Sequence, residues 1–447
     1  MESASKEPQS RFINKVIFLS FGIASLLGWN ALLTKLDFFN FYLENINPFK
    51  SFAFYNYILN ISFQFILIWK KNIFPFKQQL IAGIVGTILF LVALPLSASN
   101  LGVNSLQNKI VTIILIILMG FINALTSGGF FSYSGLFPLE MIVFFTMGQG
   151  ISAVLMNLLE YIVIASIHID EHDSLEDRTR KTNISAWIFF SFAILILIFC
   201  LILLLYSYKD EYCLYYLNKG QSLDKNNKKS SKQLALISPD EISDNNVDEK
   251  NVQSIKNLDD DENLDTTPTV ERSFLYIFKK IWDLDLLACY GYIVTFGLFP
   301  VVCLKHKVFE LGSYNSVTII FTYNLFDTIG RFLVKLMKPT KFANMIILLG
   351  RSILFFTIIF NHYCQVKLGS SLTFTSIYLL ANVAILGVTN GMGATLTFGL
   401  ASEVAEDEIK KQTGGSIGFF SILGIFLGSC LAFGTGEIID SYTPKKQ

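Results

Sequence analysis

Long apolar runs separated by short polar segments dominate the chain, and most of these runs approach the roughly 20 residues that a helix needs to cross the hydrocarbon core of a bilayer. Hydropathy therefore predicts about eleven transmembrane helices and an all-α polytopic membrane protein. We expect these helices at residues 12–36, 54–69, 79–97, 110–137, 141–167, 184–206, 284–303, 317–337, 342–363, 372–398 and 414–433.

The longest polar segment lies between the sixth and seventh apolar runs, at residues 210–271. It has a basic part at 225–232, an acidic part at 240–265 and few aromatic residues after Tyr216. Because this composition cannot bury enough apolar surface to order a chain, we interpret the segment as a largely disordered cytoplasmic linker. The predicted layout is an N-terminal segment (1–11), a six-helix half (12–206), the linker (207–283), a five-helix half (284–435) and a C-terminal tail (436–447).

Composition and spacing exclude several classes of protein. Only 16% of the residues are charged and 52% are hydrophobic, whereas soluble domains carry about 25% charged residues. The formal net charge is zero, which gives no reason to expect a nucleic-acid partner. The six cysteines and four histidines show no metal-binding spacing, and the chain has no phosphate-binding loop and no paired catalytic set. We therefore expect neither an enzyme nor a cofactor, and no obligate protein partner is indicated.

Basic residues near the ends of the predicted helices indicate the orientation. Most of them fall on the side of the N-terminus, although Lys305 and Lys307 form a basic turn on the other side. The majority consists of Lys6, Arg11, Lys15, Lys70, Lys71, Lys77, Lys335, Lys338, Lys341, Lys410 and Lys411. This asymmetry predicts a cytoplasmic N-terminus and an extracellular C-terminus, and we expect the plasma membrane to be the host membrane.

The eighth apolar run carries three polar residues on one helical face. Asn324, Asp327 and Arg331 stand at i, i+3 and i+7. A carboxylate and a guanidinium inside a membrane cost several kcal/mol unless they pair or line a wet cavity. One reading is a structural Asp327–Arg331 pair that closes a helical turn. The other reading, which we favour, is a substrate site in the core of a transporter.

Two further helices offer polar and aromatic groups that suit such a site. In the first run, Leu26, Trp29 and Leu33 share a face, and Asn30 is an amide that lipid cannot satisfy. Trp29 is open to two interpretations, an interfacial anchor or a stacking ring. In the fifth run, Gln149 lies between two glycines. Amides, an ion pair and aromatic rings together suit a flat, hydroxylated heteroaromatic ligand.

Five motifs occur in order along the chain: GIASLLGWN, FFSYSGLFP followed by GQG, NLFDTIGR, TNGMGATL and TGGSIGFFSILGIFLGS. Together they resemble the motifs of the equilibrative nucleoside transporter family, and the resemblance spans most of the membrane region. The chain departs from the family pattern at Gly28, which stands where the family has a proline before the tryptophan. This departure removes a fixed kink and leaves the preference among bases open.

The resemblance implies a major-facilitator-like fold with six-helix and five-helix halves around a central site. It also implies that Trp29 stacks on the base, that Gln149 bonds to the base edge, and that Asp327 and Arg331 bind ribose hydroxyls. The full substrate set implied in this way, with Asn30 added for its amide, is Leu26, Trp29, Asn30, Leu33, Gln149, Phe299, Asn324, Asp327 and Arg331. Leu33 and Pro300 are the candidate gate residues.

The sequence thus predicts a facilitative transporter that moves nucleosides, and nucleobases as a further cargo, by alternating access. One alternative is a proton-coupled nucleoside symporter, for which the membrane-embedded Glu160 is the candidate coupling acid. An alternative of another class is a membrane receptor that senses a ligand without moving it.

Overall fold

The structure is a computed structural model, and it describes residues 8–46, 48–69, 75–167, 173–219, 274–337, 340–407 and 409–442. The residues in these ranges form helices and connecting turns, with no β-strand among them. Most of the predicted linker (207–283), namely residues 220–273, lies outside the described residues. Residues 443–447 of the predicted tail also lie outside them.

Among the described residues, eleven helical spans are long and apolar enough to cross a membrane, which confirms the all-α polytopic prediction. The first six spans are built from α1 (Phe12–Thr34), α3 (Pro48–Trp69), α4 (Phe76–Asn100), α5 (Leu106–Asn123) continued by the π-helical turn η2 (Ala124–Gly128) and α6 (Gly129–Ser134), α7 (Leu139–Ser166) and α8 (Leu175–Ser207). The other five are built from α11 (Phe274–Leu298), α12 (Asn315–Leu333), α13 (Lys341–Gly350) followed by α14 (Ile353–Val366), α15 (Leu372–Val404) and α16 (Lys410–Tyr442). Shorter pieces are α2 (Leu36–Leu43) and the 3₁₀ turns η1 (Glu44–Ile46), η4 (Cys303–Lys305), η5 (Gly312–Tyr314) and η6 (Val334–Leu336).

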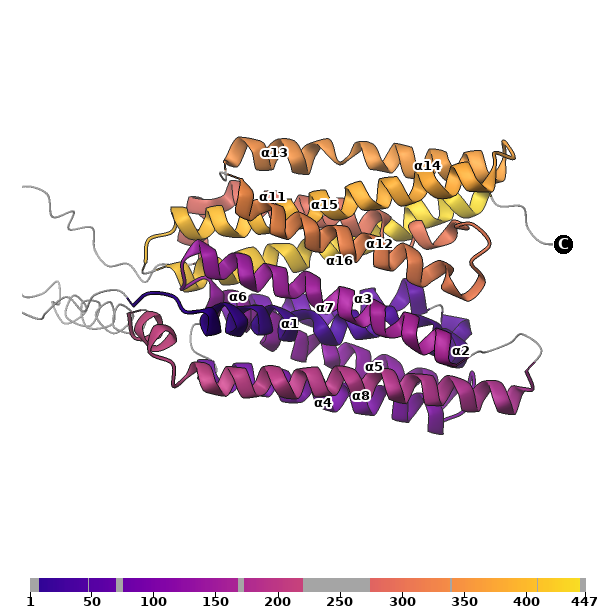
Figure 1. Ribbon diagram of the computed structural model, residues 1–447, viewed down its shortest axis with the longest axis horizontal. Helices are drawn as coiled ribbons and strands as arrows, with labels where there is room; N and C mark the ends of the chain where they lie inside the picture. Colours follow the sequence, from indigo (N-terminus) through magenta and orange to yellow (C-terminus); the bar gives the residue numbers. More distant parts are fainter. Residues whose placement is uncertain are drawn as a thin grey trace, which may run out of the picture.

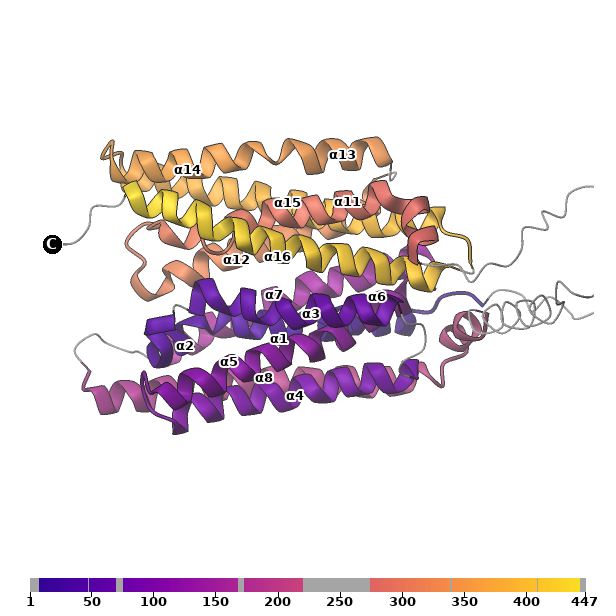
Figure 2. The same cartoon turned by 180° about the vertical axis from the view of Figure 1, so that it is seen from behind.

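The helices form two halves that lie side by side (Figures 1 and 2). We call α1–α8 the N-half and α11–α16 the C-half. The halves meet where α7 packs on α12 and α15, and where α3 and α6 pack on α16. The seam between the halves is therefore lined by α3, α6 and α7 on one side and by α12, α15 and α16 on the other.

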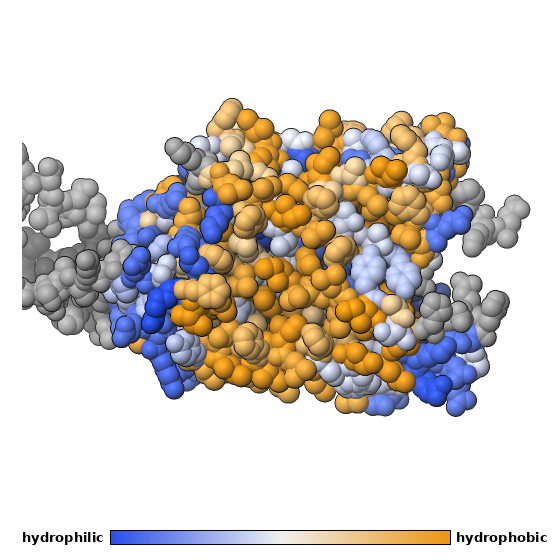
Figure 3. Space-filling model, viewed as in Figure 1, coloured by the Kyte–Doolittle hydropathy of each residue, from blue (hydrophilic) through white to orange (hydrophobic). Residues whose placement is uncertain are grey.

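A broad apolar band runs around the middle of the face seen in Figure 3, with hydrophilic residues at both ends. Large apolar side chains point outward along the surface helices, as with Phe192 and Leu195 on α8. Since lipid is as apolar as these side chains, their exposure is what a bilayer requires. We call the end where α1 begins the N-end and the end where α16 finishes the C-end (Figure 1).

Two helices begin well before their apolar runs. The sixth span starts at Leu175 rather than 184, and the seventh starts at Phe274 rather than 284. The extra turns of the sixth span are polar because they project beyond the apolar band, whereas those of the seventh carry Lys279, Lys280 and Asp283 among mostly apolar residues. The sixth begins with Ser174 as N-cap and an Arg180–Asp177 ion pair of 3.1 Å, which stabilise a helix end in water. Hydropathy detects the part of a helix that crosses the hydrocarbon core of the membrane and misses the turns that extend beyond it.

The linker was predicted to begin at residue 207, but residues 211–219 are helical and packed. Tyr212, Cys213 and Tyr216 are buried, and the ring of Tyr216 lies 4.9 Å from that of Phe137. This apolar contact orders a segment whose average composition is polar. At the other end of the chain, α16 continues to Tyr442, so the predicted tail from 436 is largely helical.

Candidate substrate-binding site

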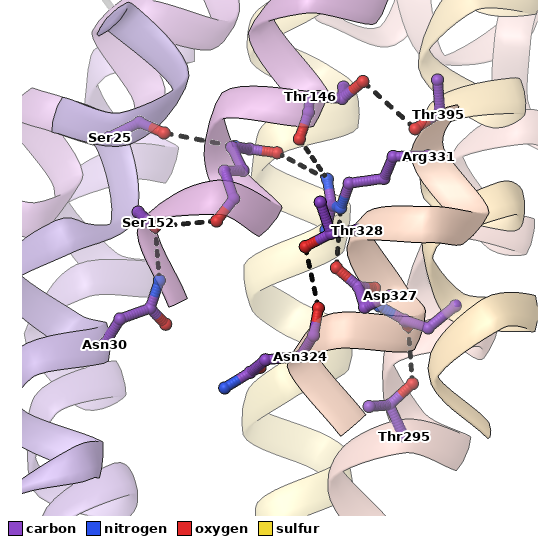
Figure 4. A network of polar contacts seen from close by, with 12 residues as sticks. Ser25, Asn30, Thr146, Ser152, Thr295, Asn324, Asp327, Thr328, Arg331 and Thr395 are labelled. Carbon is purple, nitrogen blue, oxygen red and sulfur yellow. Dashed lines mark hydrogen bonds and ion pairs between the residues drawn. The ribbon is translucent and has the colours of Figure 1, made fainter. Parts of the chain in front are cut away.

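A buried polar network joins the two halves in the middle of the bundle (Figure 4). Arg331 Nε of α12 donates to Asp327 Oδ2 at 2.7 Å, so the carboxylate and guanidinium of the predicted face do pair. Arg331 Nη1 then crosses the seam and donates to Gln149 Oε1 at 3.0 Å and to the Thr146 carbonyl at 3.1 Å, both on α7. A single guanidinium therefore connects the ion pair of the C-half to the amide of the N-half.

The second oxygen of Asp327 also has a partner. Asn390 Nδ2 of α15 donates to Asp327 Oδ1 at 2.7 Å, and Asn390 Oδ1 accepts from Thr295 Oγ1 at 2.7 Å. The backbones come close here because Gly391 has no side chain, and a Cβ at that position would overlap the Asp327 carbonyl oxygen. The carboxylate is thus held from both sides, which fixes its orientation in the seam.

A second buried guanidinium stands behind this pair. Arg351, at the join between α13 and α14, donates to Thr295 Oγ1 at 2.6 Å, to Asn390 Oδ1 at 3.3 Å and to the Leu386 carbonyl at 3.2 Å. It is 3% exposed and forms no ion pair with any described carboxylate. The described core of the network therefore holds two cations and one anion. Arg351 also turns the Asn390 amide so that its nitrogen faces Asp327.

On the N-half side, Gln149 and Asn30 are tied to neighbouring hydroxyls. Gln149 Nε2 donates to Ser25 Oγ of α1 at 3.3 Å. Asn30 Nδ2 donates to Ser152 Oγ at 2.6 Å, and that hydroxyl donates to the Gln149 carbonyl at 2.7 Å. Figure 4 shows these bonds linking α1 to α7 opposite the ion pair. The predicted amides therefore lie in one network with Asp327 and Arg331.

Asn324 stands apart from the bonded groups. Its side chain is half-buried and makes no hydrogen bond to a described residue, while its carbonyl accepts from Thr328 Oγ1 at 2.8 Å. In Figure 4 its amide points away from α12 toward the side of α1 and Asn30. This leaves a free donor and acceptor facing the seam on the C-end side of the ion pair.

Trp29 lines a cleft nearer the C-end. The ring is 6% exposed and packs edge-on against Tyr57 at 5.1 Å. Its indole Nε1 is buried without a partner among the described residues, and a buried N–H of this kind usually has an acceptor. The cleft has a volume of about 10 Å³, room for about one water molecule. Its lining is Trp29, Leu33, Leu36, Pro48, Phe52, Ala53, Phe296, Pro300, Val301, Ser429 and Phe433.

Both predicted gate residues line this cleft, Leu33 from the N-half and Pro300 from the C-half. Two other predicted residues lie elsewhere. Phe299 is 4% exposed and stacks on Tyr323 at 4.1 Å inside the C-half, away from the cleft lining. Leu26 is half-buried and is not part of the lining. The ring of Phe299 was expected at the site, but it packs within the C-half.

Glu160 does not reach the network. Lys35 Nζ donates to both of its carboxylate oxygens at 2.8 Å and to Ser185 Oγ at 2.7 Å, and both charged side chains are buried. Glu160, the candidate coupling acid of the sequence analysis, is thus a paired carboxylate in the structure. The pair lies wholly within the N-half, which favours a structural role over that of a coupling acid.

A second cleft opens on the N-end side of the network and also has a volume of about 10 Å³. It is lined by Phe131, Thr146, Gln149, Leu287, Ala288, Gly291, Tyr292, Leu348, Asn390, Gly393, Ala394, Thr397, Ile417 and Ser421. With only about one water's space in each cleft, the halves are closed around the network.

The halves touch at both ends of the seam. At the C-end, Tyr161 of α7 and Thr318 of α12 share a hydrogen bond of 2.7 Å. At the N-end, Lys335 Nζ lies 5.1 Å from the ring of Phe144, and Lys219 pairs with Asp407 at 2.7 Å. Hydrogen bonds from Lys219 and then Lys410 hold the pKa of Asp407 below its usual value. These contacts describe an occluded arrangement.

Sequence reasoning missed several members of the network, chiefly Asn390, Thr295, Thr146 and Arg351. Arg351 had a usable signal, since it is the single cation inside the ninth apolar run. Asn390 lies in the motif TNGMGATL but carried no assigned role. The two threonines had none, because a hydroxyl on a membrane helix usually bonds to its own backbone.

Comparison with known proteins gives a consistent result. A model of the family described as "Nucleoside transporter" matches residues 113–435. The chain is 22% identical to equilibrative nucleotide transporter 4 of Arabidopsis thaliana over 433 residues, which cover 96% of each chain. It is 24% identical to equilibrative nucleoside transporter 1 of Homo sapiens over 476 residues, which cover 96% of this chain and 98% of the relative.

Among solved structures, the chain resembles the proton:xylose symporter XylE of the major facilitator superfamily, with a TM-score of 0.60 and 13% identity over 97% of this chain and 96% of that one. It also resembles the major facilitator superfamily transporter FucP in its outward conformation, with a TM-score of 0.52 and 11% identity over 97% and 98% of the two chains. At these identities the likeness concerns the fold, which is of the major facilitator type.

Proposed function

The chain belongs to the nucleoside transporter family and is a facilitative nucleoside transporter rather than an enzyme, and we propose that its substrate binds at the network between α1, α7 and α12. The observation that carries this proposal is the buried Asp327–Arg331 pair, which lies in the seam and reaches Gln149 of the opposite half. A charged pair at this depth contributes little to net stability but offers strong hydrogen bonds to a polar ligand.

The groups divide by chemistry into two parts. Asp327 and Arg331 offer an acceptor and a fork of donors that match vicinal ribose hydroxyls. Gln149, Asn30 and Asn324 offer amide donors and acceptors for the edge of a base. Trp29 lines the C-end cleft next to this set and offers a ring face for stacking, with its indole N–H in need of an acceptor. Purine and pyrimidine nucleosides, and nucleobases as a further cargo, fit such a set.

Alternating access follows from the seam. The contacts between the halves at the C-end and at the N-end include polar and aromatic pairs, as with Tyr161–Thr318 and Lys335–Phe144. Breaking one set while keeping the other opens the network to one side of the membrane, which is how two packed halves expose a fixed site alternately. Leu33 and Pro300 act as the gate on the C-end side in this proposal.

The N-end carries the larger share of basic residues near the membrane, including Arg11, Lys15, Lys77, Lys335 and Lys411. Because such residues are retained on the cytoplasmic side, we assign the N-end to the cytoplasm and the C-end to the outside. We also assign the protein to the plasma membrane. Protection of an N-terminal tag from protease in intact cells tests this orientation, and digestion of the tag from outside would reverse it.

The test of function is flux into proteoliposomes. Purified protein should accumulate labelled adenosine until the inside and outside concentrations are equal, with no change on adding a protonophore. Unlabelled nucleosides should compete, and free ribose should compete poorly. Uptake that exceeds equilibrium and collapses with the protonophore would establish the proton-coupled alternative, which the Lys35–Glu160 pair disfavours. Saturable binding without any flux would establish a receptor.

A further inference from the structure

An unpaired amide lies in the seam, outside the network described above. Gln64 of α3 is 1% exposed, and neither its Oε1 nor its Nε2 has a hydrogen-bond partner among the described residues. Burial of an unsatisfied polar group is unfavourable, and native structures contain few such groups. One turn earlier on the same face, the buried Asn60 has an unpartnered Oδ1. Hydrogen bonds to the described residues therefore do not account for these polar groups on α3.

Two glycines make room for the Gln64 amide, one from each half. A Cβ on Gly128 would lie 2.9 Å from Gln64 Nε2, and a Cβ on Gly418 of α16 would lie 3.2 Å from it. Gly128 ends the π-helical turn η2 that interrupts the fourth span, and π-helical turns inside helices occur often at functional sites. The amide thus sits where α3 and η2 of the N-half face α16 of the C-half.

The position connects Gln64 to the cleft on the N-end side of the network. Its neighbour Gly418 also faces Phe131, and Phe131 lines that cleft together with Ile417 and Ser421 of α16. Gln64 is five residues from Trp69 at the N-end of α3, or about 8 Å along the helix, whereas Gln149 is ten residues from Leu139 at the N-end of α7, or about 15 Å. Gln64 therefore lies nearer the N-end than the network does. It is close to residues that line the cleft but is not itself part of the lining.

We propose that Gln64 forms a second subsite for the base of the nucleoside, occupied when the transporter is open at the N-end. The inference rests on the proposed function and adds to it a second binding site on the path of the substrate toward the N-end. Opening at that end requires α16 to separate from α3 and α6, which would uncover the amide on the path of the substrate. A primary amide presents a donor and an acceptor side by side, the pair that glutamine uses to bind the N6 and N7 positions of adenine.

The amide chemistry favours a base over a sugar. The group is planar and neither of its functions has a partner among the described residues, and Phe131, which contacts the same glycine, Gly418, supplies an aromatic side chain to the neighbouring cleft. Adenine, with an exocyclic amino group next to a ring nitrogen, satisfies both functions at once. Purine riboside lacks that amino group and would leave the Gln64 oxygen unsatisfied, which a site built for the hydrogen bond penalises.

The experiment measures KM separately from each face of the membrane in oriented proteoliposomes, with protease access to an N-terminal tag reporting the orientation. For Gln64→Leu we expect the adenosine KM at the N-end face to rise about 3- to 10-fold, the effect of one or two neutral hydrogen bonds. The KM at the C-end face should change less than about twofold. Wild-type protein should prefer adenosine to purine riboside at the N-end face, and the variant should lose that preference.

Gln79→Leu is the matched control, because Gln79 is an amide beside the same π-helical turn that is already bonded to the Leu125 carbonyl at 3.2 Å. It should leave both KM values unchanged. Gln64→Met guards against a folding defect specific to leucine. An N-end KM that stays at the wild-type value in the Gln64 variants, a rise of the same size at both faces, or an intact preference for adenosine would overturn the subsite while leaving the proposed function standing. Absence of flux in the wild type would instead overturn the proposed function, and the subsite with it.

Discussion

The Asp327–Arg331 pair gives the sharpest prediction, because both members are buried and each has been assigned a role. Asp327 accepts from Arg331 Nε and from Asn390 Nδ2, both at 2.7 Å. Asp327→Asn keeps the size of the side chain but removes the negative charge. It also places an NH₂ group opposite one of those two donors, since an amide offers only one acceptor oxygen.

The magnitude follows from the burial. Removing one partner of a buried ion pair costs about 3–5 kcal/mol because the other charge is left uncompensated. Arg331 keeps its bonds to Gln149 and to the Thr146 carbonyl, so we expect a loss near the lower end of that range. About 3 kcal/mol corresponds to roughly a hundredfold in an equilibrium constant. Asp327→Asn should therefore unfold at lower temperature as well as lose nucleoside flux.

A double variant separates folding from function. In Asp327→Leu/Arg331→Met neither charge remains, and such replacements of buried pairs are often neutral or stabilising. We expect thermal unfolding in detergent to return to near the wild-type temperature, while uptake of labelled adenosine stays below one-tenth of wild type, the loss expected for at least 1.4 kcal/mol of binding. Full uptake by either variant at normal abundance would refute the role of the pair in binding. A double variant no more stable than Asp327→Asn would refute the reasoning on charge.

Three more outcomes can be checked with the same preparations. Trp29→Ala should weaken nucleoside binding several-fold and Trp29→Phe should restore much of it, because a ring stack contributes on the order of 1 kcal/mol; unchanged affinity in Trp29→Ala would make the residue an anchor. Lys35→Met should destabilise the protein strongly, by about 3–5 kcal/mol, and adding Glu160→Gln should recover most of that loss with flux still insensitive to a protonophore. Asp407 has a lowered pKa in the folded protein, so its ion pair stabilises the fold above about pH 4 and the contribution is lost as the pH falls through the folded value. The difference in unfolding temperature between Asp407→Asn and wild type should be equal at pH 6 and pH 8, and should shrink below pH 4.

The membrane architecture was predictable because lipid imposes a simple rule on sequence. Every spanning helix must be long and apolar, and the eleven spans stand out for that reason. Helix ends were less predictable, because turns outside the bilayer can be polar, as in the sixth span, which begins at Leu175. The helix at 211–219 was missed because a few buried rings decide its order, and average composition hides them.

The part of the candidate site that consists of charged residues and motif residues was predictable from the sequence. Gln149, Asp327 and Arg331 meet as expected because charges inside a membrane must find partners. Which partner each residue finds depends on how helices pack, and that information is not local. Lys35 neutralises Glu160 across 125 residues of chain, and Phe299 turns to Tyr323 rather than to the cleft. Packing within each half decided both.

The hydrogen bond between Arg331 and Gln149 has a consequence for how tightly any cargo can be held. A base that replaces the guanidinium at the Gln149 oxygen exchanges one hydrogen bond for another, so little net free energy is gained. Such an exchange keeps affinity moderate, and a moderate affinity shortens the residence time of the cargo. A carrier that works without an energy source turns over only as fast as it releases its cargo. Competition from Arg331 for the Gln149 oxygen favours that release.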